Sequence, residues 1–316
     1  MLLKPVYAND GGLVDRPLTD VHSPWVPKEG VHLYHFPLSL DSQKARVCLE
    51  ELGILWESRV ILLIAHQQYS PAYVRINSRC VVPTLVIDGK VTTDTINMLR
   101  YLADRFGADT DSLQTSDDER ILVDYWVEKS ASLFIEALTY GYVEGAQKSF
   151  PWSNTNDSGK SHLAKVNLLS KLIEKYQDDD ALKLAYEKKR AVTDATRNAI
   201  VTPTHMSAIV ESTRDDLDEL EQQLNSGPFG AGGWVASKDY SLADIQWGVA
   251  LYRLQGLGLQ PLLWGSDSKI SLYTGKLFAR DSFQRGVVEW LSVFRKVAMP
   301  MMRYKLSKAL GLTRDS

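Results

Sequence analysis

The sequence predicts an α/β domain followed by an all-helical domain. Between residues 31 and 107, short runs of β-branched residues alternate with amphipathic stretches that have helical spacing. From residue 116 onward the apolar residues recur only at helical spacing. The chain has 316 residues, 44% of them hydrophobic, so it is long and apolar enough to bury a sizeable core.

Residues 1–30 contain four prolines, several Asp and Gly, and no clear periodicity. We expect this stretch to be an extended N-terminal arm that lies on the body of the protein. We assign it no chemistry.

The segment from Val31 to Gly53 organises the first domain. It reads as a short strand, a loop with Pro37, and a helix whose first turn contains Asp41 and Ser42. A helix N-terminus has unpaired amides and partial positive charge, so Ser42 can either cap the helix or offer its hydroxyl to an anion. We expect the helix to be half buried. Its apolar face is Ala45, Cys48, Leu49 and Leu52, and its outward face is Lys44, Glu50 and Glu51.

The next elements complete the α/β domain. The β-branched run from Trp56 to Ile64 predicts a second strand, parallel to the first because a helix connects them. Pro83 then precedes a strand, and Asp88-Gly89 predicts a hairpin turn. A Pro at the entrance of a strand can leave the neighbouring backbone free to pair with a peptide-like ligand.

After that hairpin, Asp94 and Thr95 begin a further helix, so polar side chains again lie at a helix start. The second domain, residues 116–316, then reads as a series of helices. A long apolar stripe runs through 117–145 with an interruption near Lys129, and a Gly/Pro/Ser/Asn-rich gap follows. Charged helices over 160–176 and 181–199 form a helical insertion at about 146–200.

Later in this domain another helix follows Pro203, and Ser241 and Asp244 form a capping box before a strongly apolar helix that ends at Gly256.

Composition excludes several functions. The net charge of −3 gives no general case for binding nucleic acid or an acidic membrane, and the locally basic stretch 295–308 reads as a solvated helix. Two cysteines, Cys48 and Cys80, make no disulfide framework, and no apolar run is long enough to span a bilayer. We therefore expect a cytoplasmic protein, and we assign no metal site.

These features together resemble the cytosolic glutathione transferase superfamily. The resemblance rests on the loop-helix at Ser42, the Val82-Pro83 pair, Asp94-Thr95 in place of the family's usual Glu-Ser, and the buried capping box in Tyr240-Ser241-Leu242-Ala243-Asp244. The stretches LYHFPLSLDSQKARV, VVPTLV and SLADIQWGVALYRLQGLG, with the charged insertion, are similar to bacterial members that degrade aromatics. Those members are the dichlorohydroquinone reductive dechlorinases and, more loosely, the β-aryl-ether-cleaving enzymes.

The resemblance implies a thioredoxin-like N-terminal domain that binds glutathione. Ser42 would stabilise the thiolate, the backbone of Val82 beside Pro83 would pair with the cysteinyl part, and Asp94 and Thr95 would hold the γ-glutamyl end. The residues alone leave a second reading open for each, namely a helix cap for Ser42 and Asp94-Thr95 and a rigid turn for Pro83. We take Asp244 as structural.

The same resemblance places an acceptor pocket between the Ser42 loop and the first long helix. The candidate lining is Leu133, Phe134, Tyr140 and Tyr142, which would suit an aromatic acceptor. The alternative for each is ordinary helix packing.

From these residues we expect a glutathione-dependent transferase or lyase that cleaves a lignin-type β-aryl ether and releases a phenol. Dehalogenation of chlorinated aromatics is the alternative, weakened because the dechlorinases resembled carry a Cys where this chain has Asp41. A non-catalytic partner subunit is the other alternative. We expect a homodimer or a heterodimer.

Overall fold

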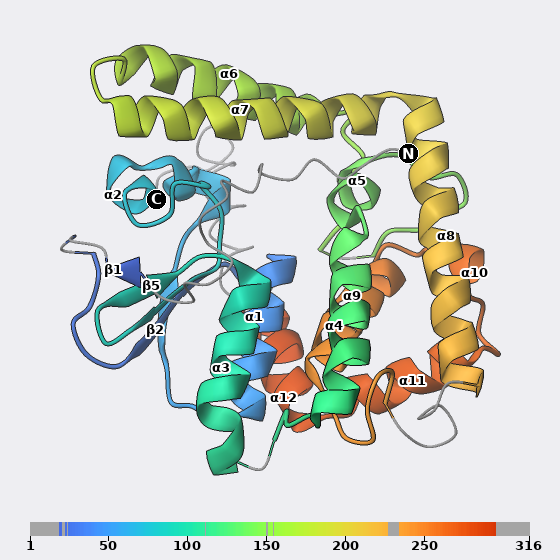
Figure 1. Ribbon diagram of the computed structural model, residues 1–316. Helices are drawn as coiled ribbons and strands as arrows, with labels where there is room; N and C mark the ends of the chain where they lie inside the picture. The colour runs from blue at the N-terminus through green and yellow to red at the C-terminus, as the bar shows by residue number, and fades with distance from the viewer. Residues whose placement is uncertain are drawn as a thin grey trace, which may run out of the picture.

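The computed structural model describes residues 19–20, 23, 25–110, 112–149, 151–153, 155–226 and 234–294. Most of the expected N-terminal arm and the basic stretch 295–308 lie outside the described residues. Figure 1 shows the strands and short α2 on one side of the molecule, α4, α5 and α8 to α11 on the other, and α6 and α7 lying across the top.

The strands are β1 (Thr19–Asp20), β2 (Val31–His35), β3 (Glu57–Val60), β4 (Thr84–Ile87) and β5 (Lys90–Thr92). The helices of the first domain are α1 (Leu40–Glu51), α2 (Pro71–Val74) and α3 (Thr95–Thr110), with 3₁₀ turns η1 (Leu63–Ala65) and η2 (Gln67–Tyr69). The later helices are α4 (Asp117–Ser132), α5 (Ile135–Tyr140), α6 (Lys160–Lys175), α7 (Asp180–Val201), α8 (Pro203–Ser226), α9 (Leu242–Gly256), α10 (Gln260–Leu263), α11 (Lys269–Phe278) and α12 (Asp281–Phe283). A π-helical turn, η3 (Gln284–Val288), and α13 (Glu289–Val293) follow.

The strands form one mixed sheet in the order β1-β5-β4-β2-β3. The prediction that the first two strands after the arm are parallel is confirmed, since β2 pairs with β3 in parallel register. The strand β3 ends at Val60, earlier than expected, because the chain turns into η1 and η2 around His66, which has φ of 57°. The predicted Asp88-Gly89 turn is present, with φ of 48° and 81°, as a tight hairpin between β4 and β5 requires.

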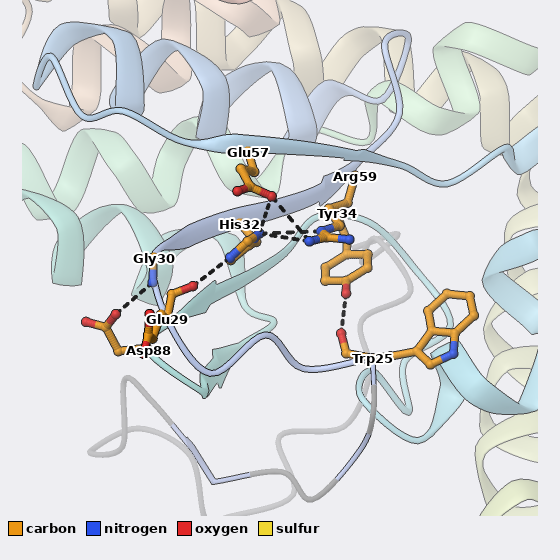
Figure 2. A network of polar contacts seen from close by, with 8 residues as sticks. All are labelled: Trp25, Glu29, Gly30, His32, Tyr34, Glu57, Arg59 and Asp88. Atoms are coloured by element: carbon orange, nitrogen blue, oxygen red, sulfur yellow. Dashed lines mark hydrogen bonds and ion pairs between the residues drawn. The ribbon is translucent and has the colours of Figure 1, made fainter.

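A network of polar contacts joins β2, β3 and the segment before β2 (Figure 2). His32 on β2 contacts the backbone oxygen of Glu29 at 2.7 Å through Nε2, and Arg59 on β3 donates to His32 Nδ1 at 3.3 Å. Because a carbonyl oxygen can only accept, Nε2 carries a proton and donates it, while Nδ1 also lies 3.1 Å from the Glu57 carboxylate. Asp88 in the hairpin accepts from the amide of Gly30 at 2.9 Å. These contacts hold the beginning of β2 in place. The loop that leads into α1 follows the other end of the same strand.

The prediction that α1 is half buried is wrong. Every residue from Ser42 to Leu49 is buried, because α3 and α9 pack on this helix and the last described segment, α12 to α13, folds back over it. Gly286 in that segment lies so close that an added Cβ would come within 2.8 Å of the backbone nitrogen of Val47.

The outward positions assigned to Lys44, Glu50 and Glu51 are corrected by the same packing. Lys44 is buried and pairs with Asp41 at 3.0 Å. Glu50 accepts from Arg285 at 2.7 Å, and Glu51 pairs with Arg280. Lys44 is therefore paired within α1, and Glu50 and Glu51 bind the segment 280–285 to α1 instead of facing water.

The helical domain is built around α9, which is buried on all sides. The predicted capping box at its start is confirmed, since Ser241 and Asp244 exchange the expected hydrogen bonds. The Asp244 carboxylate accepts from Ser241 N and Oγ at 2.8 Å, from Val235 N at 3.0 Å and from Tyr273 OH at 2.5 Å. Asp244 thus fastens α9 to α11 and to the loop before it.

The predicted charged insertion is a hairpin of α6 and α7, and Figure 1 shows it lying along one edge of the molecule, over α2. On the inner face of this hairpin, the hydroxyl of Tyr186 donates to the carbonyl of Tyr69 in the first domain at 2.8 Å. Cys80 is buried in the same contact. Among the described helices, none is long and apolar enough to cross a membrane.

Candidate active site

Three of the segments singled out from the sequence meet at one edge of the sheet. Tyr34 of β2 pairs with Thr84 of β4, and Leu85 of β4 pairs with Thr92 of β5, all antiparallel. The end of β2, the beginning of β4 and the end of β5 therefore lie side by side. The loop into α1, the Val82-Pro83 pair and the start of α3 continue from these three strand ends.

The loop-helix corner at the end of β2 holds two serines. Ser39 is the N-cap of α1, half exposed, and its Oγ accepts from the amide of Ser42 at 3.3 Å. Ser42 lies in the first turn of the helix, is 0% exposed, and its Oγ accepts from the amide of Phe36 at 3.3 Å. Both hydroxyls keep a proton to donate, but only that of Ser39 is on a partly exposed residue. The sequence reasoning overlooked Ser39, although two serines three residues apart at a helix start were a visible signal.

Asp41 is partnered in this corner by Lys44. A free carboxylate beside a thiolate would raise the pKa of the thiol. Because the buried Lys44 ammonium lies 3.0 Å from the carboxylate, the negative charge of Asp41 is compensated within the first turn of α1.

At the second strand end the Val82-Pro83 peptide bond is cis. Val82 is buried, and within the described residues neither its N–H nor its C=O takes part in a hydrogen bond. The preceding carbonyl of Val81 is held by the hydroxyl of Tyr73 at 2.7 Å and by the amide of Asn77 at 2.9 Å. A backbone edge with fixed geometry and unused donor and acceptor is suited to pairing with a peptide-like ligand.

At the third strand end Asp94 caps α3. Its carboxylate accepts from the amide of Asn97 at 3.0 Å and pairs with Arg79 at 3.1 Å. Thr95 is the first residue of the helix and is half exposed. The site at this edge therefore combines a carboxylate, a guanidinium, a hydroxyl and a helix N-terminus, groups that can bind an amino-acid end.

The four candidate acceptor residues lie around the junction between α4 and α5, but not in one lining. Leu133 and Phe134 are buried between the two helices. Tyr140 ends α5 and packs edge-on against His162 of the insertion, with ring centroids 4.9 Å apart. Tyr142 is 69% exposed. Helix packing explains the first two, so their role in substrate binding stays a prediction.

Two buried arginines beside this corner were missed by the sequence reasoning. Arg46 lies in the middle of α1, and Arg253 lies in the last turn of the otherwise apolar α9. For Arg253, a lone cation within the largely apolar α9 was a signal, since arginine is almost never fully buried without a partner. For Arg46, in the charged α1, there was no such signal. In the part of the chain that the structure describes, no group of His, Cys, Asp and Glu could hold a metal ion.

Comparisons with known proteins agree with this geometry. Residues 39–105 match the family of glutathione S-transferase N-terminal domains. The chain is 27% identical over 258 residues to a tetrachloro-p-hydroquinone reductive dehalogenase of Sphingobium chlorophenolicum, covering 80% of this chain and 94% of the relative. It is 24% identical over 284 residues to the glutathione S-transferase TCHQD of Arabidopsis thaliana, covering 90% and 99% of the two chains.

A solved structure has the same fold. The β-etherase LigF from Sphingobium sp. strain SYK-6 superposes with a TM-score of 0.60 at 20% identity, over 81% of this chain and 98% of that one. The domain match shows that residues 39–105 form a glutathione S-transferase N-terminal domain, and the chain as a whole is similar to glutathione transferases, with a thioredoxin-like N-terminal domain and a helical C-terminal domain. Glutathione is the cosubstrate of this family.

Proposed function

We propose that this protein is a glutathione-dependent transferase in which the thiolate displaces a leaving group from an electrophilic carbon of an aromatic acceptor. The observation that carries the proposal is the meeting, at one sheet edge, of the α1 start, the unpaired backbone of Val82 and the polar start of α3. Glutathione is a tripeptide with a thiol in the middle and an amino acid at one end. These three segments offer a partner for each part.

In this proposal the Val82 backbone pairs with the cysteinyl part, Asp94 binds the ammonium, and Thr95 with the N-terminus of α3 binds the carboxylate of the γ-glutamyl end. The sulfur then lies at the start of α1, where the helix N-terminus and a serine hydroxyl stabilise the thiolate. Ser42 is the donor that the sequence suggests. Ser39 is the second candidate, because it is the more exposed of the two serines.

The names of the sequence relatives favour a chlorinated aromatic acceptor. The sulfur lone pair would form the S–C bond, and the electron pair of the C–Cl bond would leave with chloride. Reductive release of the arene from this conjugate requires a further thiol. Cys48 and Cys80 are both buried, burial raises the pKa of both thiols, that of Cys80 to about 12, and neither stands at the corner, where this chain has Asp41. We therefore propose that the reaction ends at the glutathione conjugate.

Cleavage of a β-aryl ether is the second candidate. It needs the same thiolate and an acceptor whose leaving group is a phenolate. Its support is the fold shared with LigF, which at 20% identity does not specify an acceptor. We also expect the protein to form a homodimer or a heterodimer, which light scattering of the purified chain would measure. A non-catalytic partner subunit would keep this fold without turnover.

Conjugate formation tests the proposal. Purified protein, glutathione and 1-chloro-2,4-dinitrobenzene should give the conjugate and chloride, and a lignin-type β-aryl ether assayed in parallel should show whether phenol is released. Replacing both Ser39 and Ser42 with Ala should lower kcat/KM about 100-fold or more, the loss typical of removing a hydrogen-bond donor to a reacting anion. The single variants then assign the donor. A double variant as active as the wild type would remove the hydroxyls from the mechanism, and absence of glutathione binding by calorimetry would reject the proposal.

A further inference from the structure

Two buried arginines hold the loop between β2 and α1 from different sides. Arg46 of α1 is 0% exposed and is surrounded by acceptors. Its Nε donates to the carbonyl of Gly286 at 2.7 Å, its Nη1 donates to His35 Nδ1 at 3.0 Å, and its Nη2 donates to the carbonyl of Pro37 at 3.1 Å. Each nitrogen of this guanidinium therefore has a partner.

Arg253 of α9 reaches the same loop from the helical domain with far fewer partners. It is 6% exposed, and Nη2 donates to the carbonyl of Leu38 at 2.6 Å. That is its one hydrogen bond to the described residues, although a guanidinium has five N–H groups. Its Nε is buried and has no acceptor among the same residues. Both arginines are thus buried, but Arg253 has far fewer hydrogen-bond partners than Arg46.

Among the described residues, no carboxylate forms an ion pair with Arg253. Asp41 is near enough to influence it electrostatically, but within the described chain the ion pair of Asp41 is with Lys44 at 3.0 Å. Burial lowers the pKa of Arg253 to about 10, opposed by Tyr140 and Asp41, so the guanidinium remains charged near neutral pH. A buried cation without a paired anion is costly, which suggests that a ligand supplies the anion.

The surroundings of Arg253 fit an aromatic ligand. The guanidinium stacks on the ring of Trp152, 4.6 Å from the centroid. Trp152 packs directly on Gly256, where an added Cβ would clash with the ring. The arginine therefore has a fixed orientation beside the loop that we assign to the glutathione sulfur, and Tyr140 is near enough to influence its charge.

We propose that Arg253 is a specificity-determining residue that binds an oxyanion, phenolate or carboxylate, on the aromatic acceptor. The inference rests on the proposed function, because it places the acceptor beside the sulfur. Hydrogen bonds from Nε and the free Nη edge to the oxyanion would orient the ring so that its electrophilic carbon faces the thiolate. A purely structural Arg253 would only hold the carbonyl of Leu38.

The test compares two acceptors that differ in one charge, 4-chloro-3-nitrobenzoate and its methyl ester, in the wild type, Arg253→Met and Arg253→Lys. In Arg253→Met, kcat/KM for the acid should fall about 10- to 100-fold more than for the ester, the effect expected from losing hydrogen bonds to a charged group. Arg253→Lys should regain part of the preference. The matched control is Arg214→Met, an exposed arginine on α8, which should leave the acid-to-ester ratio unchanged.

Equal losses for acid and ester in Arg253→Met would overturn the inference and leave Arg253 as a support of the loop. Calorimetry of 4-chloro-3-nitrobenzoate binding to the wild type and to Arg253→Met separates this outcome from a failure of the proposed function. If the wild type makes no conjugate but binds the acid, and Arg253→Met does not, oxyanion binding by Arg253 stands while the transferase proposal falls. If the two bind the acid equally, the inference is wrong whatever the activity. Thermal unfolding of each variant verifies that it is folded.

Discussion

Replacing His35 with Gln should make the protein less sensitive to acid. His35 is 0% exposed at the end of β2, where its Nδ1 accepts from Arg46 at 3.0 Å. Its Nε2 therefore carries the proton and donates to Ser58 Oγ at 2.8 Å. The ring of Trp290 closes over it edge-on at 4.7 Å between centroids. A second proton on Nδ1 would face the Arg46 N–H that now donates to this atom, so the folded protein disfavours the protonated ring.

The size of the effect follows from linkage. Burial, with a smaller contribution from the charge of Arg46, lowers the pKa of His35 from 6.5 to about 3. Between these two values the unfolded chain binds a proton that the folded protein does not, so the free energy of unfolding falls as the pH drops below 6.5. At pH 5 the loss from this one group is about 2 kcal/mol relative to pH 7.

Urea unfolding at pH 7 and pH 5, followed by tryptophan fluorescence and circular dichroism, measures the effect. The drop in unfolding free energy between the two pH values should be about 2 kcal/mol smaller in His35→Gln than in the wild type. The variant will also lose stability at both pH values, but the difference between them is the readout. His205→Gln, on α8, is the control and should retain the full drop. An equal drop in His35→Gln and the wild type would refute the reasoning.

Two further predictions concern stability and use the same unfolding assay. Asp244→Ala removes the acceptor of four buried hydrogen bonds, and the stranded donors should cost about 4 kcal/mol or more; a loss under about 1 kcal/mol would mean that water replaces the carboxylate. Gly286→Ala places a Cβ 2.8 Å from the backbone of Val47 and should cost about 2 to 3 kcal/mol, whereas Gly275→Ala, with open space around it on α11, should stabilise by up to about 1 kcal/mol. Equal effects of the two glycine variants would show that α1 and η3, which contains Gly286, are not closely packed.

Much of the fold was predictable because its signals are local. The hairpin at Asp88-Gly89 and the capping box at Ser241 depend on residues within three positions of one another. The charged hairpin of α6 and α7 has helical periodicity on both arms and a turn of Asp residues between them. In each case the physical cause of the structure lies within the segment itself.

The errors on α1 have the opposite cause. Arg46 finds an acceptor on Gly286, 240 residues away in sequence, and Glu50 finds Arg285, 235 residues away. Periodicity cannot reveal a partner at that distance, so charged residues on the second face of α1 were taken to face water. The helix α1 carries both charged and apolar residues because both of its faces are covered. On one face its carboxylates form ion pairs with Arg280 and Arg285.

The candidate site was predictable in part. The sheet register brings together the segments of Ser42, Val82 and Asp94, which the sequence had selected one by one. The sequence alone does not decide whether Ser39 or Ser42 is the N-cap of α1. The two side chains are chemically the same, so the choice depends on the residue at which the helix begins. Arg253 was not predicted as a site residue because its link to the site is a hydrogen bond to the carbonyl of Leu38, which lies 215 residues away in the other domain.

The fold-back of α12 to α13 over α1 has a consequence for synthesis on the ribosome. The segment up to α3 is made first, yet its central helix receives the Gly286 acceptor and the Trp290 cover only after some 180 more residues have been added. At about 5 to 20 residues per second this delay is on the order of ten to forty seconds. During it the nascent first domain carries an uncovered arginine and leaves apolar residues of α1 uncovered. Translation rate and chaperone access should therefore influence the yield of this protein more than for chains whose N-terminal domain is complete when it leaves the ribosome.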